Sequence, residues 1–389
     1  MSHRTRSAMI AIVAAALLAG CASTIVHPSP STMVSPSLSQ SPQPTPSLPS
    51  PSPTPTPSIP EGFQPEALTA ISDTDFWVLS AAECSSLACG SEILHTLNAG
   101  KTFQRIAAPP ATFLAGNGTT PGSPTVSDIR FADAADGWVF GNTLWATHNG
   151  GAAWHQVLLS EPIAVVAQLE PGANGYVYAV FQLCANPSVA SNCTFRLMRS
   201  HANSDLWSLL TPPGNPAGRP AIGVHGNTVW VMYFQGSTGV EWISHDDGVL
   251  WNRGSMPCEP DLGGNFDPVS TTVIWAFCAT GNFGNPWVSS SGGATWTPAG
   301  GVGGLFSNGA MVAALSSQHA FVGGGGNTLA VSGNGGGTYQ PIPELAGDQW
   351  AGFTDSEVGY AITLNEDNGW TLLWRTSDAG AHWTRISLP

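Results

Sequence analysis

Short apolar segments alternate with polar turns along most of the chain, from residue 61 to residue 389. In residues 131–139, an apolar segment is followed by a polar turn that contains Asp133 and Asp136, and then by a second apolar segment at 137–139. Comparable stretches are residues 73–78, 175–180, 227–231, 272–277, 319–322 and 355–362. Apolar runs of this length, separated by turns, predict pairs of antiparallel β-strands.

A turn motif follows most of these strand pairs, with Ser or Thr first, a short polar residue third, Gly fifth and an aromatic residue eighth. The third, fifth and eighth residues of six copies are Asn98, Gly100 and Phe103; Asn149, Gly151 and Trp154; Asp246, Gly248 and Trp251; Ser291, Gly293 and Trp296; Asn334, Gly336 and Tyr339; and Asp378, Gly380 and Trp383. A seventh copy, which begins at Ser200, keeps Trp207 but has Ala202 and Ser204 in place of the acid and the glycine.

These residue types suit a hairpin turn. Glycine tolerates a positive φ, the short polar side chains bond the N–H groups of the turn, and the aromatic ring packs between sheets. The seven aromatic residues are 43 to 53 residues apart, which is the length of one four-stranded antiparallel sheet. The sequence therefore predicts an all-β chain in which residues 61–389 form a single seven-bladed β-propeller. The chain begins with the first strand of a repeat and ends with the fourth strand of a repeat. We therefore expect the ring to close without exchanging a strand between the termini.

The motif resembles the BNR or Asp-box repeat of sialidases, of sortilin-type receptors and of the photosystem II assembly factor family, which belong to the WD40/YVTN/BNR-repeat-like superfamily. The resemblance covers roughly the last five-sixths of the chain. It is specific for the propeller fold but not for one activity, since proteins of unrelated function share this scaffold.

The N-terminus has the pattern of an export signal. Arg4 and Arg6 precede the apolar run 8–18, which is too short to span a bilayer, and Leu18-Ala19-Gly20-Cys21 resembles the lipobox of bacterial lipoproteins. The resemblance implies a signal peptide at residues 1–20 and a lipid on Cys21, which would anchor the chain to the cell membrane, at the cell surface or in the periplasm. The alternative is an ordinary signal peptide that happens to end in cysteine.

Residues 21–60 are dominated by Pro, Ser and Thr, a composition that cannot bury a core. Proline favours extended polyproline II, so this segment can reach on the order of 100 Å. We expect a disordered linker that holds the propeller away from the membrane.

The charge of the chain excludes some partners. The formal net charge is −14, and loss of Arg4 and Arg6 with the signal peptide takes it to −16, so the sequence predicts no binding of nucleic acid. Lys101 is the only lysine, which leaves no polybasic patch for anionic lipids. We therefore expect contact with the membrane only through the lipid anchor.

Six cysteines remain after Cys21, an even number for an exported chain. Sequence alone allows fifteen pairings among six cysteines. Closeness along the chain favours Cys84 with Cys89, Cys184 with Cys193, and Cys258 with Cys278, all at the end of the propeller opposite the motif turns. The alternative is free, buried cysteine.

A sialidase, which the family resemblance would imply, needs three arginines around the substrate carboxylate. The Arg-Ile-Pro sequence that typically opens such enzymes is absent. Only two arginines are expected on innermost strands, Arg130 and Arg219. The others considered fall on outer or third strands: Arg105, Arg253, Arg385, Arg199 and Arg375. Sialidase activity is therefore not expected.

No metal ion or cofactor is predicted. The ten histidines are scattered without HExxH spacing, and the glycine runs do not precede helices. Four histidines are expected at motif turns, where exposed polar residues are ordinary: His148, His201, His245 and His382.

The remaining function is binding on the face that carries the disulfides, where the stretches 107–125, 184–193 and 258–268 are expected to be loops. Candidate ligand-binding residues there are Asp261, Phe266, Asp267, Phe283 and Trp287, although aromatic residues also serve as blade packing. We expect a monomeric, non-catalytic propeller that binds a protein or polysaccharide of the cell envelope, as an assembly or scaffold factor. The alternative is a secreted glycoside hydrolase that uses acidic residues such as Asp261 and Asp267 on this face. These acids can also be explained as part of a solvated loop without a catalytic role.

Overall fold

The structure is a computed structural model of the whole chain. It divides into residues 1–54 and 55–389, and all described residues belong to the second unit. They are residues 62–81, 89–114, 124–184, 193–214, 216, 218–235, 238–259, 263–280, 283–300, 311–323, 328–365 and 367–388. The predicted signal peptide, Cys21 and the predicted linker lie outside them. Within the described part, no helix is both long and apolar enough to cross a membrane.

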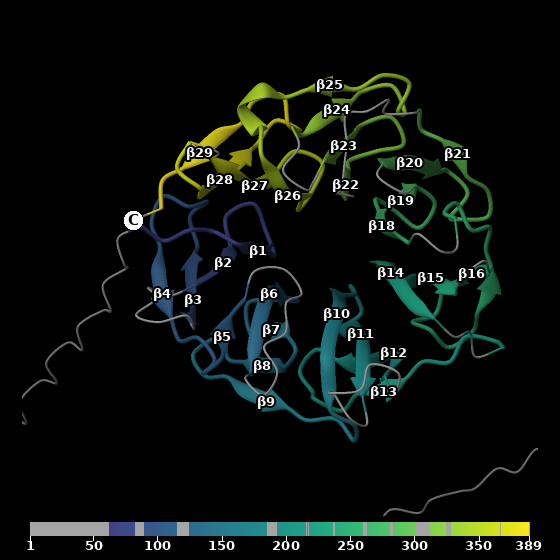
Figure 1. Cartoon of the computed structure of the whole chain (residues 1–389), viewed down its shortest axis with the longest axis horizontal. Coiled ribbons are helices and arrows are strands. Elements are labelled where there is room, and N and C mark those ends of the chain that lie inside the picture. The colour runs from purple at the N-terminus through teal and green to yellow at the C-terminus, as the bar shows by residue number, and fades with distance from the viewer. Residues whose placement is uncertain are drawn as a thin grey trace, which may run out of the picture. The chain divides into compact units, whose positions relative to one another are not determined.

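The described strands form six sheets, which are arranged in chain order around a common axis (Figure 1). The first sheet has nine strands: β1 (Ala67–Ala70), β2 (Phe76–Ala81), β3 (Cys89–Thr96), β4 (Gln104–Ile106), β5 (Thr112–Phe113), β6 (Thr125–Phe131), β7 (Asp136–Gly141), β8 (Leu144–His148) and β9 (His155–Val157). Each of the other five is a four-stranded antiparallel meander, the arrangement of a β-propeller.

The five meanders are β10 (Ile163–Pro171), β11 (Tyr176–Cys184), β12 (Cys193–His201) and β13 (Ser208–Leu209); β14 (Arg219–His225), β15 (Thr228–Gln235), β16 (Thr238–Ser244) and β17 (Asn252–Arg253); β18 (Gly264–Pro268), β19 (Ile274–Thr280), β20 (Phe283–Ser289) and β21 (Thr297–Pro298); β22 (Met311–Ala314), β23 (Ala320–Gly323), β24 (Ala330–Ser332) and β25 (Gln340–Pro341); and β26 (Asp348–Phe353), β27 (Gly359–Asn365), β28 (Trp370–Thr376) and β29 (Thr384–Ile386). A short 3₁₀-helix, η2 (Pro343–Leu345), follows β25.

The nine-stranded sheet contains two meanders, β1–β4 and β6–β9, which β5 connects. β5 pairs with β3 in antiparallel fashion and with β6 in parallel fashion. The sequence predicted a loop for residues 107–125. That expectation was wrong for Thr112–Phe113, because these two residues pair with the start of β3 on one side and with the start of β6 on the other.

The turn motif forms a recurrent hydrogen-bonded turn, named here the motif turn. In six copies the first hydroxyl accepts the N–H of the fifth residue at 2.8 to 3.1 Å, as in Gly100 to Thr96 and Gly248 to Ser244. The fourth and fifth residues have positive φ in all six, for example 58° at Ala99 and 80° at Gly100. Glycine at the fifth position meets this backbone requirement without steric cost.

The seventh copy adopts a different turn. The Ser200 hydroxyl donates to the carbonyl of Ser204 at 2.7 Å, and neither residue 203 nor Ser204 is among the residues with positive φ. Without the glycine and the acid, the chain between β12 and β13 takes another path.

The core lies between successive sheets. Large aromatic residues on the second strand of each meander, such as Trp77, Trp138 and Trp275, are fully buried. Motif aromatics complete the packing from the outer side, since Trp154 contacts Phe131 edge-on and donates its indole N–H to Ala107 O at 2.8 Å.

The ring closes by side-chain packing, without strand exchange among the described strands. Phe76 on β2 and Tyr360 on β27 pack with ring centroids 4.8 Å apart. The Tyr360 hydroxyl and the Arg375 guanidinium both donate to Asp73 O, at 3.3 and 3.1 Å. The first and last sheets thus share one apolar cluster.

Two of the three expected disulfides lie within the described residues. Cys184 is bonded to Cys193 at the connection from β11 to β12, and Cys258 to Cys278 at the start of the third of the five meanders. Cys89 is also disulfide-bonded, and its expected partner Cys84 lies outside the described residues.

Candidate functional site

Charged side chains gather at the axis of the ring, where the sequence predicted mainly apolar strands. Three innermost strands place a charged residue one position before their last residue: Arg130 on β6, Glu170 on β10 and Asp267 on β18. Each faces a large aromatic residue of the second strand, Trp138, Tyr178 and Trp275 respectively. The three charged residues therefore occupy the same register position in their sheets, near the turn to the second strand. Their strands β6, β10 and β18 line the axis of the ring (Figure 1).

Arg130 is held in place by a carboxylate of its own strand. Its Nη1 lies 2.8 Å from Asp128 Oδ1, and the two side chains are 23% and 34% exposed. Burial acts to lower the pKa of Arg130, but the charges of Asp128 and Glu170 outweigh it, so the pKa is raised. The guanidinium is a permanent cation that solvent can still reach.

Arg130, Glu170 and Asp267 are named here the axial group. Both acids of this group, Glu170 and Asp267, have raised pKa values. Burial raises the pKa of Glu170, against the opposing effects of the Arg130 charge and of a 3.2 Å hydrogen bond from Gln168. Burial also raises the pKa of Asp267 to about 7, although Ala314 N–H donates to its Oδ2 at 2.5 Å. Near neutral pH, the Asp267 carboxyl can therefore accept or donate a proton.

Some axial contacts hold neighbouring sheets together. Asp267 joins β18 to β22 through Ala314, and Gln168 exchanges two hydrogen bonds with Ile222 of β14, at 2.6 and 2.9 Å. Arg130 and Glu170 make no such backbone contact to another sheet among the described hydrogen bonds. A structural role accounts for Asp267 and Gln168 but not for the Arg130 and Glu170 charges.

Of the five predicted ligand-binding residues, the structure describes the side chains of Phe266, Asp267 and Trp287. Asp261 and the side chain of Phe283 lie outside the described residues. Phe266 is 8% exposed and stacks on Trp296, and Trp287 packs against the same cluster, so both serve the core. The expectation that residues 258–268 form a face loop was wrong for Gly264–Pro268, which are the innermost strand β18. Of the five residues, Asp267 is the one that the axial group includes.

Arginine positions follow the sequence prediction. Arg130 and Arg219 lie on the innermost strands β6 and β14, whereas Arg105, Arg253 and Arg385 lie on the outermost strands. Sequence reasoning missed Arg130 and Glu170 as candidate site residues. The sequence did contain a signal for these two residues, because each is a charged residue within an apolar run and stands directly before the last residue of its strand.

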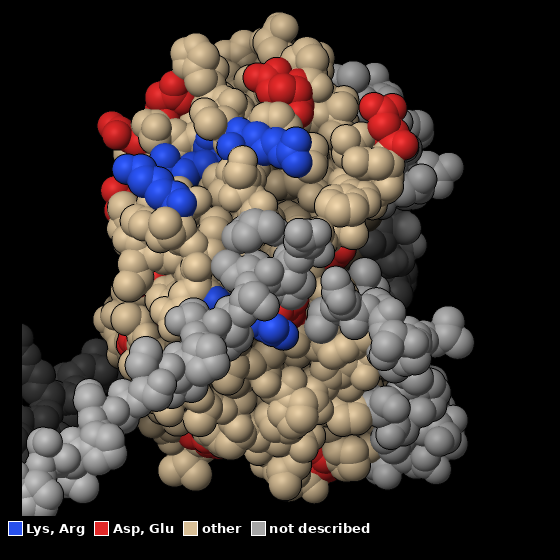
Figure 2. Space-filling view, turned by 90° about the vertical axis from the view of Figure 1, so that its left-hand side faces the viewer, with Lys and Arg blue, Asp and Glu red and all other residues tan. Residues whose placement is uncertain are grey.

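The outer wall offers no comparable arrangement in the view of Figure 2. Most of that surface is uncharged, and its basic side chains have acidic neighbours. One ion pair on an outer strand joins Arg105 Nε to Glu92 Oε1 at 2.5 Å, with the glutamate side chain 2% exposed.

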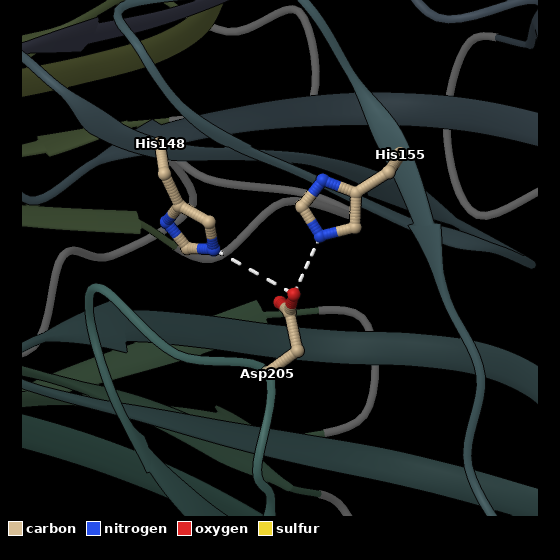
Figure 3. A group of neighbouring side chains, drawn as sticks. All are labelled: His148, His155 and Asp205. Atoms are coloured by element: carbon tan, nitrogen blue, oxygen red, sulfur yellow. Dashed lines mark hydrogen bonds and ion pairs between the residues drawn. The ribbon is translucent and has the colours of Figure 1, made fainter.

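A second group of polar side chains lies between two successive meanders. His148, His155 and Asp205 have ligand atoms within 4.8 Å of one another (Figure 3). It is the one group of this kind found in the described part of the chain. Sequence reasoning missed it because Asp205 is distant along the chain and only the ring brings it close.

The chain is similar to solved β-propellers, although no family model and no curated protein matches it. YCF48 bound to D1 peptide is 14% identical, with a TM-score of 0.54, over 82% of this chain and 95% of that one. YCF48 from Cyanidioschyzon merolae is 15% identical, with a TM-score of 0.52, over 84% of this chain and 98% of that one. The β-propeller domain of the Trilobed protease from Pyrococcus furiosus is 9% identical, with a TM-score of 0.50, over 84% of this chain and 99% of that one. That domain is described as having an open velcro topology. These likenesses show the propeller fold.

Proposed function

We propose that this protein is a non-catalytic propeller that binds an extended segment of another protein at the axis of the ring. The observation that carries the proposal is the set of Arg130, Glu170 and Asp267 at one register position, with Arg130 still partly exposed. Partly desolvated charges lower the stability of the fold unless they are paired, and such charges cluster at functional sites. Asp128 compensates Arg130, which leaves Glu170 to attract a cationic group, and a bound cation would favour the charged form of this carboxyl.

The proposal includes seven blades built from Asp-box repeats. The nine-stranded sheet contains two meanders, and five further sheets follow. The six motif turns and the altered turn at Ser200 fall once in each of these seven meanders, which supports this count.

A protein segment is favoured over a glycan for two reasons. A propeller of similar fold, YCF48, has been solved bound to D1 peptide. Phe266 and Trp287, the aromatic residues considered for sugar contact, are committed to the core. A binder of this kind would serve as an assembly or scaffold factor.

Attachment to the membrane through Cys21 completes the proposed function. The lipobox and the Pro-rich linker support a propeller that is displayed outside the cytoplasmic membrane. The Cys21→Ser variant is expected to lose incorporation of labelled palmitate and to leave the membrane fraction. Equal palmitate labelling of both forms would rule out this anchor.

One observation favours a second function. Asp267, with a pKa raised to about 7, has the protonation behaviour of a general acid, and Glu170 is close enough to influence it. A glycoside hydrolase with these two carboxyl groups at the axis is the alternative.

The binding proposal can be tested with the soluble form that starts at Glu61. An array of extended peptides would be probed with this form and with the Glu170→Gln variant. We expect lysine- and arginine-containing peptides to bind, and to bind at least tenfold more weakly after the substitution. Glu344→Gln on η2 is the matched control, since Glu344 is an exposed acid in the connection between β25 and β26 and does not lie on an innermost strand. Equal loss in both variants, or no preference for cationic peptides, would contradict the proposal.

A further inference from the structure

The group of His148, His155 and Asp205 joins two successive meanders. His148 is the last residue of β8 and the second residue of a motif turn, and His155 begins β9. Asp205 comes from the next meander, in the connection between β12 and β13. Asp205 Oδ2 lies 2.5 Å from His155 Nε2 and 3.6 Å from His148 Nε2 (Figure 3).

A buried acid orients His148. Asp136 Oδ1 lies 2.7 Å from His148 Nδ1, and Asp136 is 8% exposed. A carboxylate on one ring nitrogen fixes the proton there and leaves Nε2 as a free electron pair. That free nitrogen faces Asp205, as in histidines that bind a metal ion and are held by a second carboxylate.

Asp205 has unused capacity. Its Oδ1 is buried and has no hydrogen-bond partner among the described residues, while its Oδ2 faces both imidazoles. A buried oxygen without a partner costs free energy, and a cation bound through both carboxylate oxygens would give Oδ1 a partner.

Asp205 lies in the copy of the motif that forms the altered turn. In the motif turns, the third residue is an acid, amide or serine that bonds N–H groups of its own turn. In the seventh copy that position is Ala202, and Ser200 and Ser204 hold the turn instead. Asp205 is the sixth residue of this copy, and its side chain contacts the preceding meander.

We propose that His148, His155 and Asp205 bind one divalent transition-metal ion, with Zn²⁺ as the best match, and that this ion connects the two meanders. Two imidazoles and one carboxylate form a known ligand set for zinc, with water as the fourth ligand. The side chains are 29%, 49% and 31% exposed, which leaves access for that water.

The three ligand atoms lie within 4.8 Å of one another, so zinc binding would require side-chain movements but no large rearrangement. Bonds of about 2.0–2.1 Å place tetrahedral ligand atoms roughly 3.3 Å apart. The 3.6 Å separation from His148 to Asp205 already fits, whereas the hydrogen-bonded pair at 2.5 Å must open by less than about 1 Å. His155 lies on a three-residue edge strand and half of its side chain is exposed, so a small rotation suffices.

The test uses the soluble form from Glu61, purified without a histidine tag and treated with a chelator. Calorimetric titration with ZnCl₂ is expected to give one ion per chain, with a micromolar or lower Kd. Titration with CoCl₂ is expected to give visible absorption bands of a tetrahedral cobalt site.

The variants His155→Ala and Asp205→Asn should each weaken zinc binding at least tenfold and abolish the cobalt bands. His245→Ala is the matched control, because His245 is also the second residue of a motif turn but its Nδ1 faces only Thr228 Oγ1. Circular dichroism would verify that each variant is folded. Absence of zinc binding at 100 μM, or equal affinity in the Asp205→Asn variant, would overturn the proposal.

Discussion

The indole N–H of Trp296 donates to Glu241 Oε2 at 3.2 Å and thereby joins two successive sheets. Glu241 lies on β16 and is 1% exposed, and Trp296 is the motif aromatic of the next meander. Burial raises the pKa of Glu241 to about 8, although the Trp296 hydrogen bond acts in the opposite direction. At neutral pH this carboxyl is therefore mostly protonated inside the core.

Glu241 makes stability depend on pH. Because its pKa is higher in the folded state than in the unfolded state, the folded state binds the proton more tightly. Its contribution is complete below pH 4.5 and is lost as pH rises to about 8. The Glu241→Gln variant keeps an acceptor for Trp296 and should remove this part of the pH dependence, measured by urea unfolding between pH 5 and 9. Equal slopes for both proteins would contradict the assignment.

Gly336 should be one of the least replaceable residues of the motif turns. Its φ is 84°, and an added Cβ would lie 2.0 Å from Ala299 O of the preceding sheet. We expect Gly336→Ala to lower the free energy of unfolding by more than about 2 kcal/mol. Gly369→Ala is the control, since Gly369 has a φ of 72° but nothing within 4 Å of an added Cβ. Its cost should be about 1 kcal/mol, and equal costs would mean that contact with the preceding sheet is unimportant.

The two described disulfides should stabilise the fold unequally. Cys258 and Cys278 are 20 residues apart, and Cys184 and Cys193 are 9 apart. Loop-closure entropy gives roughly 3 kcal/mol for each, with the longer loop favoured by about 0.7 kcal/mol. Replacing each pair by alanine and measuring guanidinium unfolding tests this order. A larger loss from the Cys184 and Cys193 pair would show that packing outweighs chain entropy here.

The hydrolase alternative makes a separate prediction. A non-catalytic propeller should release no reducing ends from a panel of envelope and plant glycans at pH 5 to 8. If turnover is found, Glu170→Gln and Asp267→Asn should abolish it, because these are the acids at the axis. Turnover that both substitutions remove would replace the binding proposal with the hydrolase.

Much of the fold could be predicted because its determinants are local. Each motif turn is formed by residues within eight positions of one another, so Thr96, Asn98 and Gly100 can be recognised without knowledge of the ring. The alternation of apolar strands then follows from pairing between neighbours in sequence. β5 was missed because its two residues carry no pattern of their own.

The candidate sites were harder to predict because they are formed between repeats. Arg130, Glu170 and Asp267 come from three different sheets, and their common position is visible only after each strand is aligned to its aromatic partner. Asp205 was likewise hidden in the connection that breaks the motif. Positions where a repeat departs from its pattern were the informative ones.

The closure between Phe76 and Tyr360 bears on how such a chain can change during evolution. No described ladder of main-chain hydrogen bonds runs from the last sheet to the first, so duplication or deletion of the last repeat leaves the strands of every other sheet paired as before. Only the side chains at one boundary must then adapt to a new neighbour.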